Sequence, residues 1–488
     1  MMRLAIAILA TVCAAGSGGA QNAAPPSGRC VFRFDNTPTT RISGNKLPSG
    51  QYNSFIGGGV IARCPAQKIV LRSDSLEAYG DEGRLYFVGN VDYVEPRLTL
   101  KSAFLTYFQR DERLLAVQNV RANLPSGSTL RGPTLEFFRA VPRVRPVQSA
   151  TATGRPTVGL VQRDSLGRAQ PPIEVTGNNI YLTGDSVVSA VGNVVVVRPE
   201  LTATGDSLFA NSGIGLLRLM RTPKIVGTKG RPFTLVGETI DLLTRRRKLD
   251  RVLAKTAAVA TSEDLEMRSD SIDLRVTDDL LQRAIAWGRG RARATSPGQT
   301  MVADSIDVLL PKQRVRELVA IRGASAEGTP DTTKFRTTEK DRLTGDTIFA
   351  HFDSVAANDT AHKPRIRLLV AVAGRGSLAT SLQHLAPRDT SLCRPDIVYV
   401  RGRMITAYFD TGAVSRVKVA DEDKAGGIVL EAKPDSTMRC HRPAAATRAA
   451  SATNPTQPNA PRAPTPVPAS PPASTPVAPP ASSTPRRP

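Results

Sequence analysis

The sequence is poor in aromatic side chains and in histidine. Aromatic residues make up 5% of its 488 residues, Trp occurs once, and there are four His. Aromatic rings this sparse do not form stacking platforms beside the basic residues, which argues against nucleic-acid binding. The His residues show no Cys2His2-type spacing, so neither a metal site nor a cofactor is expected; they are His351, His362, His384 and His441.

The sequence also lacks an apolar run long enough for a transmembrane helix, which needs about 20 residues. Its longest apolar run, Leu4 to Gly16, has 13 residues and follows a short basic start. Small residues come next, as in a secretory signal cleaved after Ala20. We therefore predict a signal peptide over residues 1–20 and a mature protein outside the cytoplasm.

Cysteine is scarce, but the few that occur are informative. Removal of the predicted signal leaves Cys30, Cys64, Cys393 and Cys440. An even number of cysteines in an oxidising compartment predicts disulfides, and four residues allow three pairings. Two cysteines precede the repetitive region and two follow it, so we expect the local pairs Cys30–Cys64 and Cys393–Cys440. Metal binding is the alternative, against which the His spacing argues.

Acidic residues are too few to balance the basic ones. Lys and Arg number 65 against 43 Asp and Glu, which gives a formal charge of +22. This excess suggests an anionic partner or surface, such as phosphate, lipid headgroups or nucleic acid. A basic run is expected at a solvated turn between strands, with phosphate contact as the alternative; it is Arg245-Arg246-Arg247-Lys248.

The C-terminal segment has little that a core requires. Residues 443–488 include 14 Pro among 46 residues, and nearly all the others are Ala, Thr or Ser. Such a composition buries too little apolar surface to offset the entropy of ordering, which predicts a disordered tail. The tail is either a solvated extension or a spacer that contacts peptidoglycan or an anionic surface.

The chain between its ends repeats itself about every thirty residues, and this decides the fold prediction. A polar pair is followed each time by an alternating apolar run. The copies are Ser73-Asp74-Ser75-Leu76, Gly205-Asp206-Ser207-Leu208, Gly237-Glu238-Thr239-Ile240, Ser269-Asp270-Ser271-Ile272, Ala303-Asp304-Ser305-Ile306 and Gly345-Asp346-Thr347-Ile348, with Asn178-Asn179-Ile180 and Ser102-Ala103-Phe104 as degenerate forms.

A second phrase follows each of the first, with Gly between two β-branched stretches, as in Val191-Gly192-Asn193-Val194. Apolar and polar residues alternate within the phrases, which is the period of a half-buried strand. Helical spacing is not sustained, and Pro punctuates the body. We therefore predict an all-β fold of stacked, short antiparallel strands in an elongated architecture.

These features divide the chain into five parts. They are a signal peptide (1–20), an N-terminal linker and cysteine-bearing flank (21–63), a β-repeat domain (64–350), a C-terminal β extension or cap (351–442) and the disordered tail (443–488).

The alternation of the two phrases resembles the LptA/OstA family, the periplasmic lipopolysaccharide-transport proteins also called organic-solvent-tolerance proteins. The resemblance rests on phrases such as Leu71-Arg72-Ser73-Asp74-Ser75-Leu76-Glu77-Ala78-Tyr79 followed by Val88-Gly89-Asn90-Val91. It covers roughly residues 64 to 350. The chain departs from a simple bridging member by its length, its cysteine-bearing flanks and its Pro-rich tail.

The resemblance implies an OstA-like β-jellyroll with a V-shaped section, or β-taco, whose interior takes the acyl chains of lipopolysaccharide. It implies a periplasmic or outer-membrane-associated protein that binds lipopolysaccharide, or a similar amphipathic lipid, and carries it toward the outer membrane. It also implies pairing through terminal strands with other bridge proteins or with further copies of this chain. Candidate groove residues are Leu76, Phe104, Ile180, Leu208, Ile240, Ile272, Ile306 and Ile348.

Two other function classes compete with this hypothesis. A structural cell-envelope spacer or adhesin would share the fold but needs no lipid-accessible interior. A carbohydrate-cleaving β-solenoid would need paired carboxylates at one place, whereas the Asp residues recur once per repeat. We therefore expect no enzyme activity and no catalytic residues. Trp287, which precedes Gly288-Arg289-Gly290-Arg291, is expected to pack at a sheet rim, with a headgroup contact as the alternative.

Overall fold

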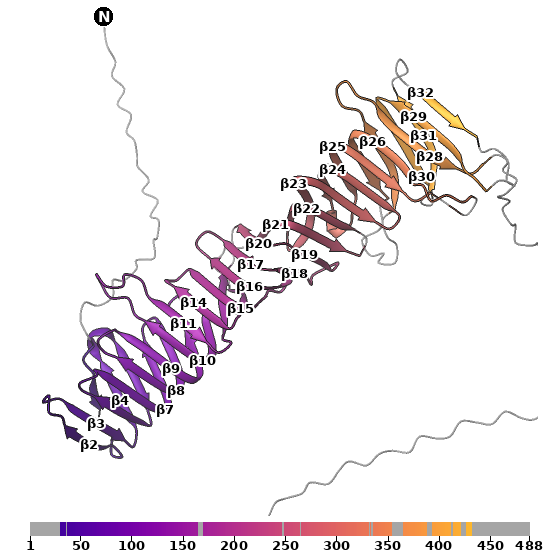
Figure 1. Cartoon of the computed structure of the whole chain (residues 1–488). Coiled ribbons are helices and arrows are strands. Elements are labelled where there is room, and N and C mark those ends of the chain that lie inside the picture. The colour runs from indigo at the N-terminus through magenta and orange to yellow at the C-terminus, as the bar shows by residue number, and fades with distance from the viewer. Residues whose placement is uncertain are drawn as a thin grey trace, which may run out of the picture. The chain divides into compact units, whose positions relative to one another are not determined.

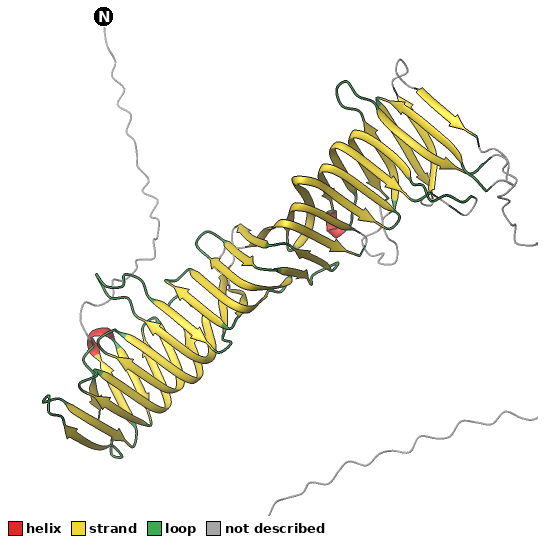
Figure 2. Cartoon of the chain, viewed as in Figure 1, coloured by secondary structure: helices red, strands yellow, loops and turns green. Residues whose placement is uncertain are grey.

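The computed structural model confirms the all-β prediction. It describes residues 30–35, 37–163, 169–245, 248–263, 265–330, 332, 335–353, 365–387, 393–410, 413–420 and 426–431. Strands dominate this part of the chain, and its only helices are two single 3-10 turns, η1 (Pro65–Gln67) and η2 (Pro311–Gln313) (Figure 2). The predicted signal, the tail and Cys440 lie outside the described residues. No helix within them is long and apolar enough to cross a membrane.

The strands follow one another closely along the chain. The first sixteen are β1 (Arg33–Asp35), β2 (Arg41–Lys46), β3 (Tyr52–Gly57), β4 (Val60–Cys64), β5 (Ile69–Ser73), β6 (Ser75–Tyr79), β7 (Arg84–Glu95), β8 (Leu98–Phe108), β9 (Arg113–Asn123), β10 (Thr129–Phe138), β11 (Ser149–Thr153), β12 (Thr157–Arg163), β13 (Ala169–Thr176), β14 (Asn179–Thr183), β15 (Val187–Val197) and β16 (Leu201–Asn211). The others are β17 (Leu216–Met220), β18 (Lys224–Gly227), β19 (Phe233–Val236), β20 (Thr239–Arg245), β21 (Lys248–Ser262), β22 (Glu266–Thr277), β23 (Leu280–Ser296), β24 (Gln299–Leu309), β25 (Glu317–Gly328), β26 (Asp341–Phe352), β27 (Ile366–Val372), β28 (Ala379–Leu385), β29 (Asp396–Gly402), β30 (Met404–Asp410), β31 (Ala413–Ala420) and β32 (Gly426–Leu430).

The strands form two layers that meet along a bent edge, which we call the corner. Long strands such as β7, β8 and β15 bend in the middle and contribute one half to each layer, and their pairing register shifts at the bend. Layer 1 runs β2, β3, β6 to β11, β14 to β17, β20 to β27, β30 and β31. Layer 2 runs β1, β4, β5, β7 to β10, β12, β13, β15, β16, β18, β19, β21 to β26, β28, β29 and β32. All pairings are antiparallel, and the strands stack in chain order (Figure 1).

The second sequence phrase marks the corner. Its Gly-Asn pairs, Gly89-Asn90 and Gly192-Asn193, both have positive φ angles, of 76° and 45° in the first pair and 81° and 49° in the second. Gly and Asn adopt this left-handed conformation more readily than other residues. A Cβ at Gly89 would also clash with the Asp74 side chain. Two left-handed residues in succession therefore turn the strand from one layer into the other.

The first phrase supplies the neighbouring strand at the corner. Asp74 donates its backbone N–H to the Gly89 carbonyl at 3.0 Å, and its carboxylate accepts a hydrogen bond from the Asn90 amide at 2.9 Å. Asp270 likewise accepts hydrogen bonds from the backbone N–H groups of Arg289 and Gly290. The recurring acids therefore hold adjacent strands at the bend, and the period of about thirty residues corresponds to two strands.

The apolar members of the first phrase share one cross-strand row on the inner face of layer 1. Ile240 pairs with Ala254, which pairs with Ile272, and Ile272 pairs in turn with Ala286. The same row contains seven of the eight candidate groove residues, and each of the seven has 0–2% of its surface exposed; they are Leu76, Ile180, Leu208, Ile240, Ile272, Ile306 and Ile348.

Phe104 is not in this row, contrary to its expected place on the interior face. Leu105 occupies the position instead and pairs with Phe87 and Ala116, all three fully buried. Phe104 is only half-buried and stacks on Tyr86, with 6.1 Å between the ring centroids. In this degenerate phrase the inward apolar residue comes one position later than we expected. Because successive residues of a strand face opposite sides, this shift of one residue turns Phe104 to the other face.

Both flanks belong to the stack where they are described. Strands β1 to β4 lie within residues 21–63 or at their boundary and pair with the β5–β7 region, so the described part of this flank is not a linker. Strands β27 to β32 extend both layers beyond residue 350. Among the described strands, β2 and β1 end the layers on one side, and β31 and β32 end them on the other.

The local disulfide pairing is present at the N-terminal end. Cys30 and Cys64 form a disulfide with 5.8 Å between their Cα atoms. Cys393 is also disulfide-bonded, and its partner lies outside the described residues. The Cys30–Cys64 bond excludes a link between Cys64 and Cys393.

Candidate binding interior

The candidate site is the apolar space between the two layers. Every second residue of a strand faces inward, and these residues form one continuous cluster of buried apolar side chains from Cys30 to Ala407. On the side opposite the corner the strands end in turns, and we call this side the mouth. Along the stack, the interior differs from one part to the next in whether side chains close the mouth.

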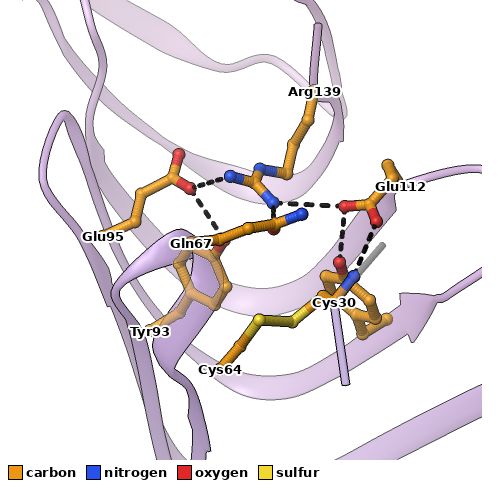
Figure 3. Close-up of a disulfide and its surroundings, with 8 residues drawn as sticks. Cys30, Cys64, Gln67, Tyr93, Glu95, Glu112 and Arg139 are labelled. Carbon is orange, nitrogen blue, oxygen red and sulfur yellow. Dashed lines mark hydrogen bonds and ion pairs between the residues drawn. A yellow bond between two sulfur atoms is a disulfide. The ribbon is translucent and has the colours of Figure 1, made fainter. Parts of the chain in front are cut away.

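Over the first ten strands a buried polar cluster, the N-terminal latch, closes the mouth. Arg139 bonds to the Glu95 carboxylate at 2.9 Å and to the Glu112 carboxylate at 3.1 Å, and it also donates to the Gln67 side chain (Figure 3). Glu95 ends β7 in layer 2, whereas Glu112 precedes β9 in layer 1. Arg139 therefore joins the two layers, and its side chain is only 14% exposed.

The disulfide holds the first described residues against the latch. The Cys30 N–H donates to Glu112 at 3.3 Å, and Phe32 packs edge-on against Tyr107 with 5.1 Å between ring centroids. The Tyr107 hydroxyl donates to Glu112 at 2.7 Å. Polar and aromatic side chains thus fill the mouth here (Figure 3).

Burial changes the ionisation of the latch. It raises the pKa of Glu95, although the Arg139 charge and the Tyr93 hydrogen bond oppose this. Burial raises the pKa of Tyr107 as well, and the Glu112 carboxylate adds to the effect. Burial alone would lower the pKa of Arg139, but the surrounding acidic groups raise it, so the guanidinium stays charged.

Farther along, the mouth opens into a cavity of about 320 Å³, which we call the middle opening. Leu160 and Ile173 line it from layer 2, and Leu182, Leu217 and Leu242 line it from layer 1. The inward faces of both layers therefore reach solvent here. This is the combination of an apolar wall and an accessible rim that a ligand with an apolar chain requires.

Charged pairs stand at the rim of the middle opening. Arg97, in the layer 2 turn before β8, bonds to Asp185, in the layer 1 turn before β15, at 2.7 Å. Both side chains are about half exposed, so this pair contributes roughly 0–1 kcal/mol. Arg198 and Glu200 form a buried pair on the layer 2 side, and Arg198 lines the cavity.

A second cavity of about 250 Å³, the distal opening, lies between the layers near their C-terminal end. Leu343 and Met301 line it from layer 2, and Leu369, Ala407 and Phe409 line it from layer 1. His384 lies at its rim.

His384 is held by two acids on the layer 2 side of this cavity. Its ring nitrogens lie 3.0 Å from Asp341 and 3.1 Å from Glu339, and its backbone N–H donates to Asp341 at 2.8 Å. The His384 side chain is 1% exposed. Its position at a cavity rim was not indicated by the sequence, in which the His residues form no pattern.

The outer face of layer 1 carries an ionic ladder that sequence reasoning also missed. Asp241 accepts hydrogen bonds from Arg218 at 2.6 Å and from Lys255 at 3.1 Å. Asp273 accepts from Arg251 at 2.7 Å and from Arg275 at 2.8 Å. Burial would raise the pKa of Asp241, but the hydrogen bonds and charges of Arg218 and Lys255 lower it. The recurrent Ile-Asp-Leu triplet could have indicated it, because an acid between two inward apolar residues must face outward.

The remaining predicted features lie away from the openings. Trp287 is partly buried beside the corner, where the chain widens into an exposed bulge, Gly288–Arg291. Arg246 and Arg247 of the basic run fall outside the described residues. Within the described ranges no three His, Cys, Asp or Glu side chains gather as a metal site would require.

Comparison with known proteins gives no family assignment. No family model matches the chain, and no curated protein matches it significantly.

Proposed function

We propose that the chain is a non-catalytic periplasmic carrier of lipopolysaccharide or a similar amphipathic lipid, which it helps to move toward the outer membrane. The observation that supports this most is the apolar interior that reaches solvent at the mouth through the middle opening. An acyl chain could lie between Leu160 and Leu217 while its charged headgroup stayed at the rim. The resemblance of the paired phrases to the LptA/OstA family motivates the choice of lipid.

Two further features agree with the proposal. The Cys30–Cys64 disulfide is typical of proteins from oxidising compartments such as the periplasm. The outermost strands β2 and β32 each pair on one side only, and their exposed residues include Ile42 and Ile428. Such edges accept a strand from another protein, so they suit pairing with other bridge components or with a second copy.

The rival proposal, a structural spacer, rests on the complete burial of Ile240, Ile272 and Ile306 in a packed row. A spacer would need that core but no ligand in the openings. The two functions therefore differ in whether a lipid contacts the cavity wall.

Photocrosslinking at adjacent residues of one strand tests the proposal. A diazirine side chain at Leu182 faces the middle opening, whereas one at Tyr181 faces outward and is 42% exposed. With purified lipopolysaccharide we expect adducts at position 182 and few at position 181. Equal labelling at both positions, or none at 182, would contradict the carrier and favour the spacer.

A further inference from the structure

Between the two openings, side chains from both layers meet at the mouth. Lys229, in the layer 2 loop between β18 and β19, bonds to Asp279, in the layer 1 turn before β23, at 3.1 Å. Gln313 of η2, also at a layer 1 end, donates to the Lys229 carbonyl at 3.1 Å. It accepts the Arg231 N–H at 2.7 Å. We call these four residues the central clasp.

Apolar side chains lie beneath the clasp. Phe233 comes from layer 2, and Leu281, Leu310 and Val315 come from layer 1; together they line a crevice of only about 40 Å³. Phe233, Leu281 and Val315 pack against the main core. The space between the layers is therefore filled at this point, in contrast to the cavities of about 320 and 250 Å³ on either side.

The backbone is adapted to the clasp as well. Gly230 has φ +77°, and a Cβ there would clash with the Gln313 side-chain oxygen. Gly meets both demands, because it has no Cβ and tolerates positive φ. A larger residue would push Gln313 away from the layer 2 loop.

We propose that the central clasp divides the interior into two compartments that take up the apolar chains of an amphipathic lipid separately. This inference rests on the proposed carrier function and adds that the groove is interrupted. The middle opening and the distal opening are then two binding sites on one chain. A lipid passes from one to the other only when Lys229 and Gln313 release the opposite layer.

The contacts of the clasp are weak enough to break and re-form while the layers stay folded. The Lys229–Asp279 pair is about half exposed, and pairs of this kind contribute little in water. The two Gln313 hydrogen bonds add a modest contribution, as neutral hydrogen bonds do. The clasp can therefore open without unfolding the layers, unlike the N-terminal latch, where Arg139 is buried between two acids.

The test places a diazirine side chain at one of three interior positions in the full chain. Leu217 lines the middle opening, Leu343 lines the distal opening, and Met267 lies in the closed section with 1% of its surface exposed. The probe is purified lipopolysaccharide, and a single-chain lysophospholipid is used in parallel. We expect labelling at Met267 to be about tenfold lower than at the openings, the ratio that about 1.4 kcal/mol of closure gives.

Opening the clasp should change this pattern. Asp279→Asn combined with Gln313→Ala removes the ion pair and the side-chain hydrogen bonds of the clasp, and labelling at Met267 should then rise toward that at Leu217. The matched control is Asp278→Asn, because Asp278 pairs with Lys248 at 3.6 Å within layer 1 and forms no ion pair with layer 2 among the described residues. The control should leave labelling at Met267 unchanged.

The outcomes separate the two proposals. Strong labelling at Met267 in the unchanged chain would overturn the compartments and leave the carrier function in place. The compartments would also fail if the Asp278→Asn control raised labelling at Met267 as much as the clasp variant does. Absence of labelling at all three positions would overturn the carrier function itself, and the compartments with it.

Discussion

The interior of the first ten strands and the interior beyond residue 248 are filled by different side chains. The three largest fully buried residues are Tyr93, Tyr107 and Phe87, all in the first section. Beyond residue 248 Ala is the most frequent buried residue, as in the row where Ala254 and Ala286 alternate with Ile. The first section thus buries larger side chains than the second, in which more of the buried side chains are Ala.

The two sections also differ in how their mouths are closed. A buried ionic latch and a disulfide close the first section, whereas a half-exposed clasp lies where the second begins and an open cavity lies near its end. The comparison indicates a division of labour within one repetitive fold. The N-terminal section is closed by buried contacts between the layers, whereas the later section contains a cavity between them.

Removing the latch should have the largest effect. Arg139→Met leaves Glu95 and Glu112 buried without their cation, which should cost about 3–5 kcal/mol of unfolding free energy. Because burial already raises the pKa of Glu95, the variant should recover stability as the pH falls and Glu95 takes up a proton. Urea unfolding at several pH values measures both effects.

The control for this variant is Arg97→Met. Arg97 also joins the two layers, but it is about half exposed and should cost less than about 1 kcal/mol. Equal losses for the two variants would contradict the distinction between a buried latch and an exposed rim pair.

Loss of the N-terminal disulfide should have the next largest effect. The double variant Cys30→Ser, Cys64→Ser opens a loop with a sequence separation of 34 residues and should cost about 2–4 kcal/mol. Stacked repeats contact mainly their neighbours, so hydrogen exchange should accelerate in β1 to β9 and stay unchanged in β23 to β26. Acceleration throughout the stack would show that the two sections unfold as one unit.

Interior volume is tested by enlarging one Ala in each section. Ala116→Leu places a larger side chain between Leu105 and Leu135 and should cost about 1–3 kcal/mol through overpacking. Ala286→Leu, between Ile272 and Ile306 in the same row beyond residue 248, should cost less because more of the buried residues in its section are Ala. Thermal unfolding compares the two, and a greater cost for Ala286→Leu would reverse the proposed difference in packing.

The outer ladder should give the smallest effect and a distinct pH dependence. Asp241→Asn should cost about 1–2 kcal/mol at neutral pH, because Arg218 and Lys255 lose their charged acceptor. The folded-state pKa of Asp241 is lowered from 3.8, so its contribution is present above that pH and lost as the pH falls through the lowered value. Unchanged chain and variant should converge in acid, whereas a constant difference would point to packing rather than charge.

Much of the fold could be predicted from the repeated phrases. Alternation in Ile272-Asp273-Leu274 identified the strands and the inward face, and the recurring Gly-Asn and Asp residues marked positions of backbone change. The prediction that Phe104 faces the interior was wrong, because a degenerate phrase leaves the strand register uncertain by one residue. The corner also required tertiary information, since Asp74 and Asn90 are separated in sequence and meet only when the strands pair.

The mouth could not be predicted in the same way. Arg139, Glu95 and Glu112 belong to no shared phrase, and Lys229 and Gln313 lie far apart in the chain. By itself the sequence indicated the all-β class, seven of the eight candidate inward residues and the Cys30–Cys64 disulfide, because these follow from period-two patterning and from where the cysteines stand along the chain. Only the tertiary structure decided where the interior is closed and where it opens, because that depends on which turns of the two layers face each other.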